Sequence, residues 1–222
     1  MFRLKAILIL LAVFFGSFSS PADSQVNLKT GYNFSIMSSP ELDRVIDLYN
    51  EVQGHTSEFG KLKWLHGFDV GLRLKSDIHA LELNYQGGYR ALRAEGQSVN
   101  VTYTDKINFA VHAFGIGYQA AGGIFGLGTD LQYQFYKTKV TSEQDGNSFK
   151  NVQHMPALKL YLLFTLKGRK GVDMALQPYY LHPFKYYDLE PLKNFIFHGG
   201  FFPKKEKWNR FGISLLFYNG SK

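Results

Sequence analysis

The residue types best suited to catalysis occur at 55–58, where the sequence reads His-Thr-Ser-Glu. A histidine near a serine can act as a general base toward the hydroxyl, provided that a third group orients the imidazole. This segment falls in a predicted loop, and strand periodicity places no carboxylate that would orient His55. Because such a spacing is common by chance, we expect no catalytic residue here.

Metal and cofactor sites are not predicted either. The chain has seven His and no Cys, which excludes a thiol nucleophile, a disulfide scaffold and a cysteine-ligated zinc site. His182 and His198 stand far apart without a tight ligand pair. The sequence has no glycine-rich phosphate loop and no nucleotide fingerprint. We therefore expect no metal and no cofactor.

The N-terminal residues are typical of an export signal. Two basic residues precede an unbroken apolar run at 6–15, and a small, polar stretch follows. The run is too short to span a bilayer as a helix, which takes about 20 residues. We predict a signal peptide at 1–24, cleaved before Gln25, and one exported domain at 25–222.

The overall charge is positive, with 25 Lys+Arg against 18 Asp+Glu. Export makes nucleic acid an improbable partner for these cations. Anionic membrane lipid or lipopolysaccharide head groups suit them better. A charged content of 19% and a hydrophobic content of 45% also argue for a folded chain over a disordered one.

From Gln25 onward the chain alternates apolar and polar residues with a period of two, which is typical of half-buried strands. The alternation slips near Ala113, which predicts a bulge in the fourth strand. Pro178 predicts the end of the seventh strand or a bulge in it, because proline cannot donate to a ladder. The eight predicted strands lie at 26–36, 62–74, 81–90, 107–118, 125–135, 158–166, 172–177 and 211–217.

The connections between these strands alternate between long and short. Such a meander gathers its long loops at one end, as transmembrane barrels do, and an even strand count puts both termini at the other end. The predicted short turns are 75–78, 120–124 and 167–171, and the predicted long loops are 37–61, 92–102, 137–153 and 182–207.

The composition of the two faces of the predicted sheet indicates which face lies on the outside of the barrel. The polar face mixes both charge signs with amides and glycines, which suits the interior of a narrow barrel, whereas the apolar face is long-chain and aromatic. We predict an all-β, eight-stranded antiparallel up-and-down transmembrane β-barrel without a wide pore. A soluble exported barrel with an apolar ligand inside is the alternative. The predicted interior polar network is Lys29, Asp69, Arg73, Glu82, Arg90, Asp130 and Asp173.

The last predicted strand carries a recognisable pattern at 210–217, Arg-Phe-Gly-Ile-Ser-Leu-Leu-Phe. Its Arg210, Gly212, Leu215 and Phe217 resemble the C-terminal assembly signal of bacterial outer-membrane proteins, which is polar, any, Gly, any, any, hydrophobic, any, aromatic. Together with the signal peptide and the meander, the chain resembles the small eight-stranded outer-membrane barrels of the OmpA/OmpX-like and porin-like families. It departs from those families in a short tail, residues 218–222, after the aromatic Phe217, where they usually end.

The resemblance implies Sec export to the outer membrane of a Gram-negative-type bacterium. It also implies insertion by the outer-membrane assembly machinery, contact with outer-membrane lipid and lipopolysaccharide, and a non-enzymatic anchoring role. Some outer-membrane barrels are lipid A deacylases with a His and a Ser on one strand face. A lipid A-modifying enzyme that uses His55 is therefore a further alternative.

Two long loops hold the candidate contact surfaces. Residues 38–52 read as an amphipathic helix with an acidic outer face, which serves either as a lid or docking element or only to order the loop. The last loop is basic and aromatic. It either binds sugar phosphates or a partner protein, or packs on that helix. Its contact candidates are Phe201, Phe202, Lys204, Lys205 and Lys207.

Overall fold

The structure is a computed structural model that describes residues 25–53, 55–98, 101–144, 146–168, 171–192 and 205–219. The predicted signal peptide at 1–24 lies outside the described residues, as do Phe201, Phe202 and Lys204. Within the described ranges, no helix is long and apolar enough to cross a membrane.

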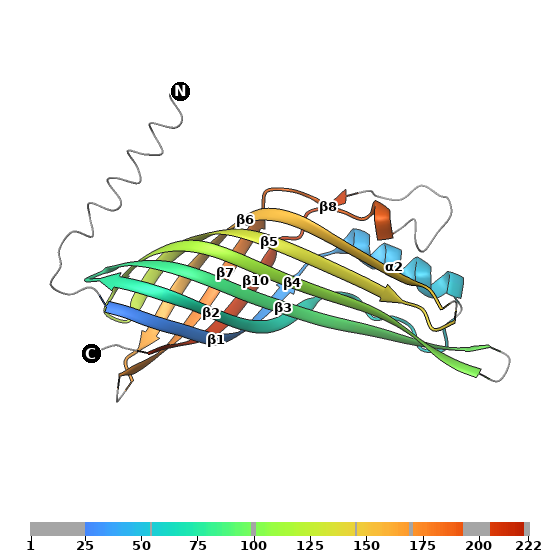
Figure 1. Ribbon diagram of the computed structural model, residues 1–222, viewed down its shortest axis with the longest axis horizontal. Helices are drawn as coiled ribbons and strands as arrows, with labels where there is room; N and C mark the ends of the chain where they lie inside the picture. The colour runs from blue at the N-terminus through green and yellow to red at the C-terminus, as the bar shows by residue number, and fades with distance from the viewer. Residues whose placement is uncertain are drawn as a thin grey trace, which may run out of the picture.

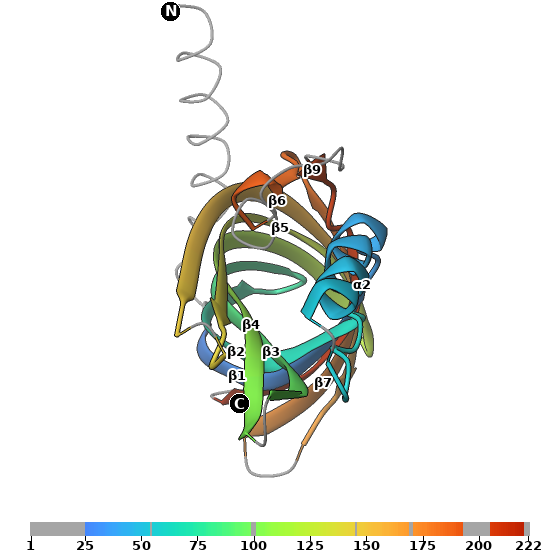
Figure 2. The same cartoon turned by 90° about the vertical axis from the view of Figure 1, so that its right-hand side faces the viewer.

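Eight antiparallel strands close into a barrel in the order β1-β10-β7-β6-β5-β4-β3-β2 (Figures 1 and 2). Each strand pairs with the next barrel strand along the chain, and β1 pairs with β10 to close the sheet. The predicted fold class is confirmed. The barrel strands are β1 (Gln25–Met37), β2 (Trp64–Ser76), β3 (His79–Ser98), β4 (Val101–Gly122), β5 (Phe125–Thr141), β6 (Ser148–Leu166), β7 (Val172–Pro183) and β10 (Arg210–Asn219).

The two ends of the barrel differ in their connections. One end carries the short turns, and β1 begins and β10 ends there (Figure 1). In the β4–β5 turn Gly123 has a φ of 63°, a left-handed conformation that glycine adopts without strain. The opposite end carries α2 (Pro40–Gln53) and a two-stranded sheet of β8 (Tyr187–Asp188) and β9 (Lys205–Glu206).

Four strands extend beyond the closed barrel at this second end. Pairing of β2 with β3 stops at His66↔Tyr89, whereas β3 and β4 stay paired up to Ser98↔Val101. Figure 1 shows these long strands projecting past the others. The predicted loops at 92–102 and 137–153 are therefore largely wrong, because most of their residues belong to strands. We call the projecting part the outer sheet; it comprises 90–98, 101–111, 136–141 and 148–155.

Along each long strand the outward face changes from apolar to polar, and the inward face changes from polar to apolar. On β5 the outward residues begin as exposed Leu131 and Tyr133 and continue as exposed Lys137 and Lys139. The inward residues change in the opposite sense, from Gln132 to apolar side chains further along. The register of β5 with both neighbours is unbroken across this exchange. The closed barrel therefore has a polar interior, and the outer sheet has an apolar one.

The same exchange explains the irregular alternation in β4. This strand pairs one-to-one with β3 and β5 through Ala113, so the predicted bulge is wrong. Val111 is buried inside, whereas Phe114 is exposed on the outside. The apolar phase slips because the apolar face moves from the inside to the outside of the barrel, without an inserted residue.

Neither alternative predicted at Pro178, the end of the seventh strand or a bulge in it, is found. Strand β7 continues through Pro178, which pairs with Ile213 of β10. On the β6 side the ladder shows no pairs between Tyr161↔Tyr179 and Phe164↔Leu176. A proline without an N–H is tolerated at this gap because no ladder bond is required there.

Leucine and phenylalanine side chains cover the outside of the closed barrel. Leu72, Leu83, Phe114, Leu127 and Leu131 are each between 46% and 62% exposed. The soluble-barrel alternative, in which these residues point inward to a ligand, is contradicted by this orientation. The exposed apolar band is what a bilayer would cover.

Candidate functional site

The interior of the closed barrel is filled by a buried polar network around Glu82. The Lys29 Nζ lies 2.8 Å from a Glu82 carboxylate oxygen, and both side chains are almost completely buried. The Asn84 amide and the Tyr218 hydroxyl donate to the same carboxylate at 3.3 and 3.5 Å. Buried charges are tolerated when they are paired and hydrogen-bonded in this way.

A second side-chain bridge links Glu82 to Arg73. When the Gln119 amide is oriented to satisfy its neighbours, its nitrogen donates to Glu82 at 3.1 Å and its oxygen accepts from Arg73 at 3.2 Å. The Arg73 guanidinium also lies 4.5 Å from the centre of the Tyr218 ring. Both charge signs are thereby held away from lipid.

A ladder of amides rises along the inner face of β5. Gln132 donates to Asp130 at 2.9 Å, Gln134 donates to Gln132 at 2.7 Å, and the Tyr136 hydroxyl donates to Gln134 at 2.7 Å. Arg210 of β10 donates across the lumen to Gln134 at 3.1 Å. This ladder connects the interior of the closed barrel to the base of the outer sheet.

Sequence reasoning missed Lys159 as a member of the interior. Its side chain is 3% exposed, donates to Gln177 at 3.0 Å and lies 4.4 Å from the centre of the Tyr179 ring. The signal was present, because Lys159 alternates with leucines in the sixth predicted strand and shares the polar phase.

Of the seven predicted interior residues, the structure places two differently. Asp173 lies at the β6–β7 turn, where it accepts a hydrogen bond from the Gly168 N–H at 3.1 Å. Arg90 lies beyond the last β2–β3 pair, and its guanidinium stacks 3.6 Å from the centre of the Trp64 ring. Both leave the network because they sit where a strand begins or loses its partner. The other five are at most 6% exposed: Lys29, Asp69, Arg73, Glu82 and Asp130.

Glycines make room for the interior tyrosines. Gly128 pairs with Tyr161, and Gly212 pairs with Tyr179. A Cβ added at Gly128 would lie 2.2 Å from the Tyr161 ring, and one added at Gly212 would lie 2.3 Å from the Tyr179 ring. Each ring therefore occupies space that only a glycine leaves free.

The four residues that resemble an assembly signal lie on both faces of β10. Arg210 and Gly212 lie on the inner face, where Arg210 binds Gln134 and Gly212 makes room for Tyr179. Leu215 and Phe217 point outward and are 38% and 40% exposed. Barrel packing alone accounts for all four positions, and recognition by an assembly machinery stays a prediction.

Helix α2 packs against the concave face of the outer sheet, as Figures 1 and 2 show. The sequence prediction of a helix at 38–52 is confirmed, with an apolar face that is at most 2% exposed. Together with apolar residues of the outer sheet, this face forms the largest hydrophobic cluster among the described residues. The helix side of the cluster is Leu42, Val45, Ile46 and Tyr49, and the sheet side includes Leu92, Ile107, Phe109 and Val140.

A carboxylate from the last long loop caps the start of α2. Glu206 accepts hydrogen bonds from the backbone N–H groups of Glu41 and Leu42 at 3.0 and 3.1 Å and from the Trp208 indole at 3.1 Å. The two backbone N–H groups belong to the first turn of α2 and have no partner within the helix, and a negative charge is favourable at this end of a helix. Burial nevertheless raises the pKa of Glu206, since desolvation outweighs the donors. The described part of the last loop thus contacts α2 through the carboxylate of Glu206.

His55 does have an orienting carboxylate, which sequence reasoning missed. Its Nε2 lies 3.1 Å from Asp105 of β4, and both side chains are fully buried. Tyr49 donates to the same carboxylate at 2.9 Å. Ser57 is exposed, and its backbone bonds to Glu95. This arrangement joins α2, the following loop and the outer sheet, and it buries the imidazole.

The remaining loop candidates are placed as follows. Lys205 is exposed, and the Lys207 Nζ lies 2.9 Å from His182 Nε2 at the top of β7. Among the described residues, no group of three or more His, Asp or Glu side chains is arranged to hold a metal ion.

Comparisons with known proteins identify the fold. The solved structure of Ail, the attachment invasion locus protein of Yersinia pestis, in complex with the heparin analogue sucrose octasulfate, is similar at a TM-score of 0.54 and 12% identity. The match covers 89% of this chain and 99% of that one. Neisserial surface protein A matches at a TM-score of 0.44 and 8% identity, over 89% of this chain and 99% of that one. No family model and no curated protein matches the sequence.

The likeness to Ail shows that this chain has the fold of the small outer-membrane β-barrels. At 12% identity it carries the fold and nothing about the loops. The resemblance inferred from the sequence, to the eight-stranded outer-membrane barrels, is confirmed at the level of the fold.

Proposed function

We propose that the protein is a non-enzymatic barrel of the bacterial outer membrane that holds a folded platform at the cell surface. The platform is α2, the outer sheet and the β8–β9 sheet. The observation that carries this proposal is the exchange of faces along β3 to β6. It gives a membrane-embedded section with an apolar outside and a water-exposed section with an apolar core, in one continuous sheet.

The buried network supports an anchoring role over a transport role. Charged and amide side chains occupy the lumen, and several of them pair with one another. An eight-stranded barrel has an interior just wide enough for its side chains. We infer that the protein does not form a wide aqueous channel.

The buried imidazole argues against the lipid A-modifying alternative. His55 and Asp105 are fully buried, while Ser57 is exposed at the surface. A general base must reach the proton that it removes. We infer that the His55–Asp105 pair stabilises the platform and that the protein is not an enzyme.

The platform offers two surfaces for contacts. The outer face of α2 is acidic and half-exposed around Asp47, and the outward face of β5 and β6 is basic. Ail, which has the same fold, was crystallised with a polyanion. We infer that the basic face contacts anionic lipid or lipopolysaccharide and that the acidic face is available to a partner protein.

Two measurements on the mature protein test this proposal. Membrane fractions are run on SDS gels with and without boiling, and the purified protein is reconstituted into planar bilayers. We expect a heat-dependent shift of the band in the outer-membrane fraction and no stable conductance. A protein found in the soluble fraction without a shift would overturn the membrane assignment, and stable open channels would overturn the anchoring role.

A further inference from the structure

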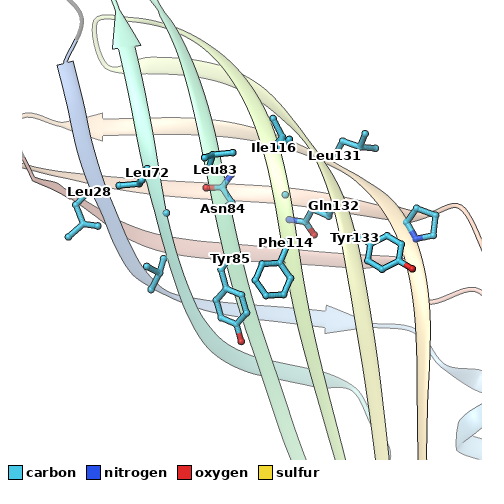
Figure 3. A pocket seen from close by; sticks show the side chains of 14 residues that line it. Leu28, Leu72, Leu83, Asn84, Tyr85, Phe114, Ile116, Leu131, Gln132 and Tyr133 are labelled. Carbon is cyan, nitrogen blue, oxygen red and sulfur yellow. The ribbon is translucent and has the colours of Figure 1, made fainter. Parts of the chain in front are cut away.

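A groove runs across the lipid-facing wall of the barrel over β2 to β5 and reaches β1 and β6 at its edges. It has a volume of about 700 Å³, which is within the range of small-ligand sites. Figure 3 shows Tyr85, Phe114 and Tyr133 projecting at its rim. Leu72 and Leu83 are among the apolar side chains that line it. A groove on this wall opens to the bilayer, so its occupant is an acyl chain.

A row of imidazoles and aromatic rings lies along the end of the groove nearest the outer sheet. On adjacent strands His112 pairs with Phe135, and Phe135 pairs with His154. Tyr85, which lines the groove, lies 2.6 Å from His112 Nδ1 through its hydroxyl. Amphipathic rings of this kind mark the level of the lipid head groups.

Three lysines stand directly beyond this row on the same outward face: Lys137, Lys139 and Lys150. Lys137 is two residues past Phe135, or about 7 Å along the strand. Lys139 pairs directly with Lys150 across β5 and β6. All three are exposed, and none forms an ion pair with another described residue, whereas the nearby Lys106 is paired with Glu143.

Two like charges placed directly opposite each other destabilise a sheet. Lys137 has Ala110 and Val152 as its direct cross-strand neighbours, and neither carries a charge. An anion bound between the three ammonium groups would relieve the repulsion. The order along the wall, from an apolar groove through an aromatic row to unpaired cations, matches an amphiphile with an acyl chain and a phosphate.

We propose that this wall is a binding site for a phosphorylated glycolipid of the outer leaflet. One acyl chain lies in the groove, and a phosphate is held by the three wall lysines. The site rests on the proposed function, since it requires the barrel to lie in the outer membrane. It goes beyond that proposal by placing the lipid on one side of the barrel, over β2 to β6.

The test measures lipid bound to the mature protein in detergent micelles by native mass spectrometry. The probes are diphosphoryl lipid A, the same lipid with both phosphates removed, and inorganic phosphate. The variant Lys137→Gln/Lys139→Gln/Lys150→Gln is compared with the matched control Lys63→Gln/Lys75→Gln/Lys167→Gln, which removes the same charge from places outside the wall and outside the last loop. A second pair, Leu131→Trp against Leu176→Trp, blocks the groove or leaves it open.

We expect the wall triple variant to lower the affinity for diphosphoryl lipid A at least tenfold and the control triple variant less than twofold. Leu131→Trp should weaken binding where Leu176→Trp does not, and the dephosphorylated lipid should bind the wild type as weakly as it binds the wall variant. Equal binding by the two triple variants, or equal binding of the two lipids, would overturn the site. If the heat-dependent gel shift is retained in that case, the proposed function stands while the lipid site fails.

Discussion

At the scale of single residues, Glu206 connects two loops that are far apart in the sequence. Its carboxylate accepts hydrogen bonds from the first two free backbone N–H groups of α2 and from the indole N–H of Trp208. A side chain of β9 therefore acts as the cap that a helix more often finds in its own sequence. Through this contact an acidic residue of the otherwise basic last loop holds the start of α2.

The raised pKa of Glu206 predicts a pH dependence of the platform. A carboxyl group whose pKa is higher in the folded state contributes stability below its unfolded pKa, and that contribution is lost as the pH rises through the folded pKa. We expect hydrogen exchange of the α2 amides to accelerate more between pH 4 and pH 7 than the intrinsic rates do. Asp43 has a pKa raised in the same direction, so the effect must be compared with a Glu206→Gln variant.

In Glu206→Gln the Glu206 part of this pH dependence should disappear. The amide nitrogen that replaces one carboxylate oxygen would face a donor, which costs about 1–3 kcal/mol for a buried group. Protection of α2 should therefore be lower in this variant throughout the pH range. If the exchange rates of the α2 amides depend on pH in the same way in the wild type and the variant, Glu206 does not cap the helix.

Glycine positions on the inner wall give a second prediction at this scale. Gly212→Ala places a Cβ 2.3 Å from the Tyr179 ring, and the ring must move within a packed interior. We expect a loss of about 1–3 kcal/mol in the free energy of unfolding by urea from micelles. Gly122→Ala is the control, because nothing lies within 4 Å of its added Cβ, and it should change stability by about 0.5 kcal/mol or less. Equal losses in both variants would contradict the close packing at Tyr179.

At the scale of elements, α2 and the outer sheet form a hydrophobic core of their own. Ile46 is fully buried between the helix and the sheet. We expect Ile46→Ala to cost about 2–5 kcal/mol of platform stability, measured by hydrogen exchange of α2 and of the outer sheet. The control Val52→Ala is on the exposed side of α2 and should have little effect.

The closed barrel should retain its heat-dependent gel shift in Ile46→Ala, because its interior network does not include α2. Loss of the shift in this variant would show that the platform and the barrel fold as one unit. Retention of α2 protection would show that the helix does not depend on this core.

The period of two and the alternation of turns predict the closed barrel well, because within the closed barrel each strand keeps a largely apolar outward face. They fail where the faces exchange. Residues 92–98 look like a loop when the apolar face is assumed to point outward, although Leu92 and Ala94 point into a core. The alternation of apolar and polar residues does not reveal which environment surrounds each half of a strand. For this reason it predicted a bulge near Ala113 of β4 where the strand is regular.

The candidate site could be predicted only where the strand phase places its residues. Lys29 and Glu82 were found because both share the polar phase of their strands. The partners of His55 and of α2 were not found, since Asp105 and Glu206 lie 50 and 165 residues away from the groups they bind. Contacts between loops depend on strand lengths that the pattern does not give.

At the scale of the whole molecule, the barrel has a lipid-facing belt and a water-facing platform. A charge placed in the belt should therefore be costly, whereas a charge above it should not. Leu162 is 49% exposed on the outer face of β6, within the belt. We expect Leu162→Arg to cost about 2–4 kcal/mol in folding into lipid vesicles.

Val152 provides a matched control for that prediction. It lies on the same strand and the same face, beyond the level of His154, and is 42% exposed. Val152→Arg should fold into vesicles with nearly the stability of the wild type. If both arginine variants fold equally well, the lipid belt is assigned to the wrong part of the strand.

The most direct test follows the outward face of β5 from one environment into the other. Because the chain has no Cys, single-cysteine variants can be made without a background. They are placed outward at Leu127, Leu131, Tyr133, Lys137 and Lys139 and inward at Gln132 and Val140, and each folded variant is treated in lipid vesicles with a water-soluble maleimide. The exchange of faces predicts no labelling at the first three outward positions, full labelling at the two lysine positions, and none at the inward positions. Uniform labelling along the outward face would contradict a barrel that leaves the bilayer between Tyr133 and Lys137.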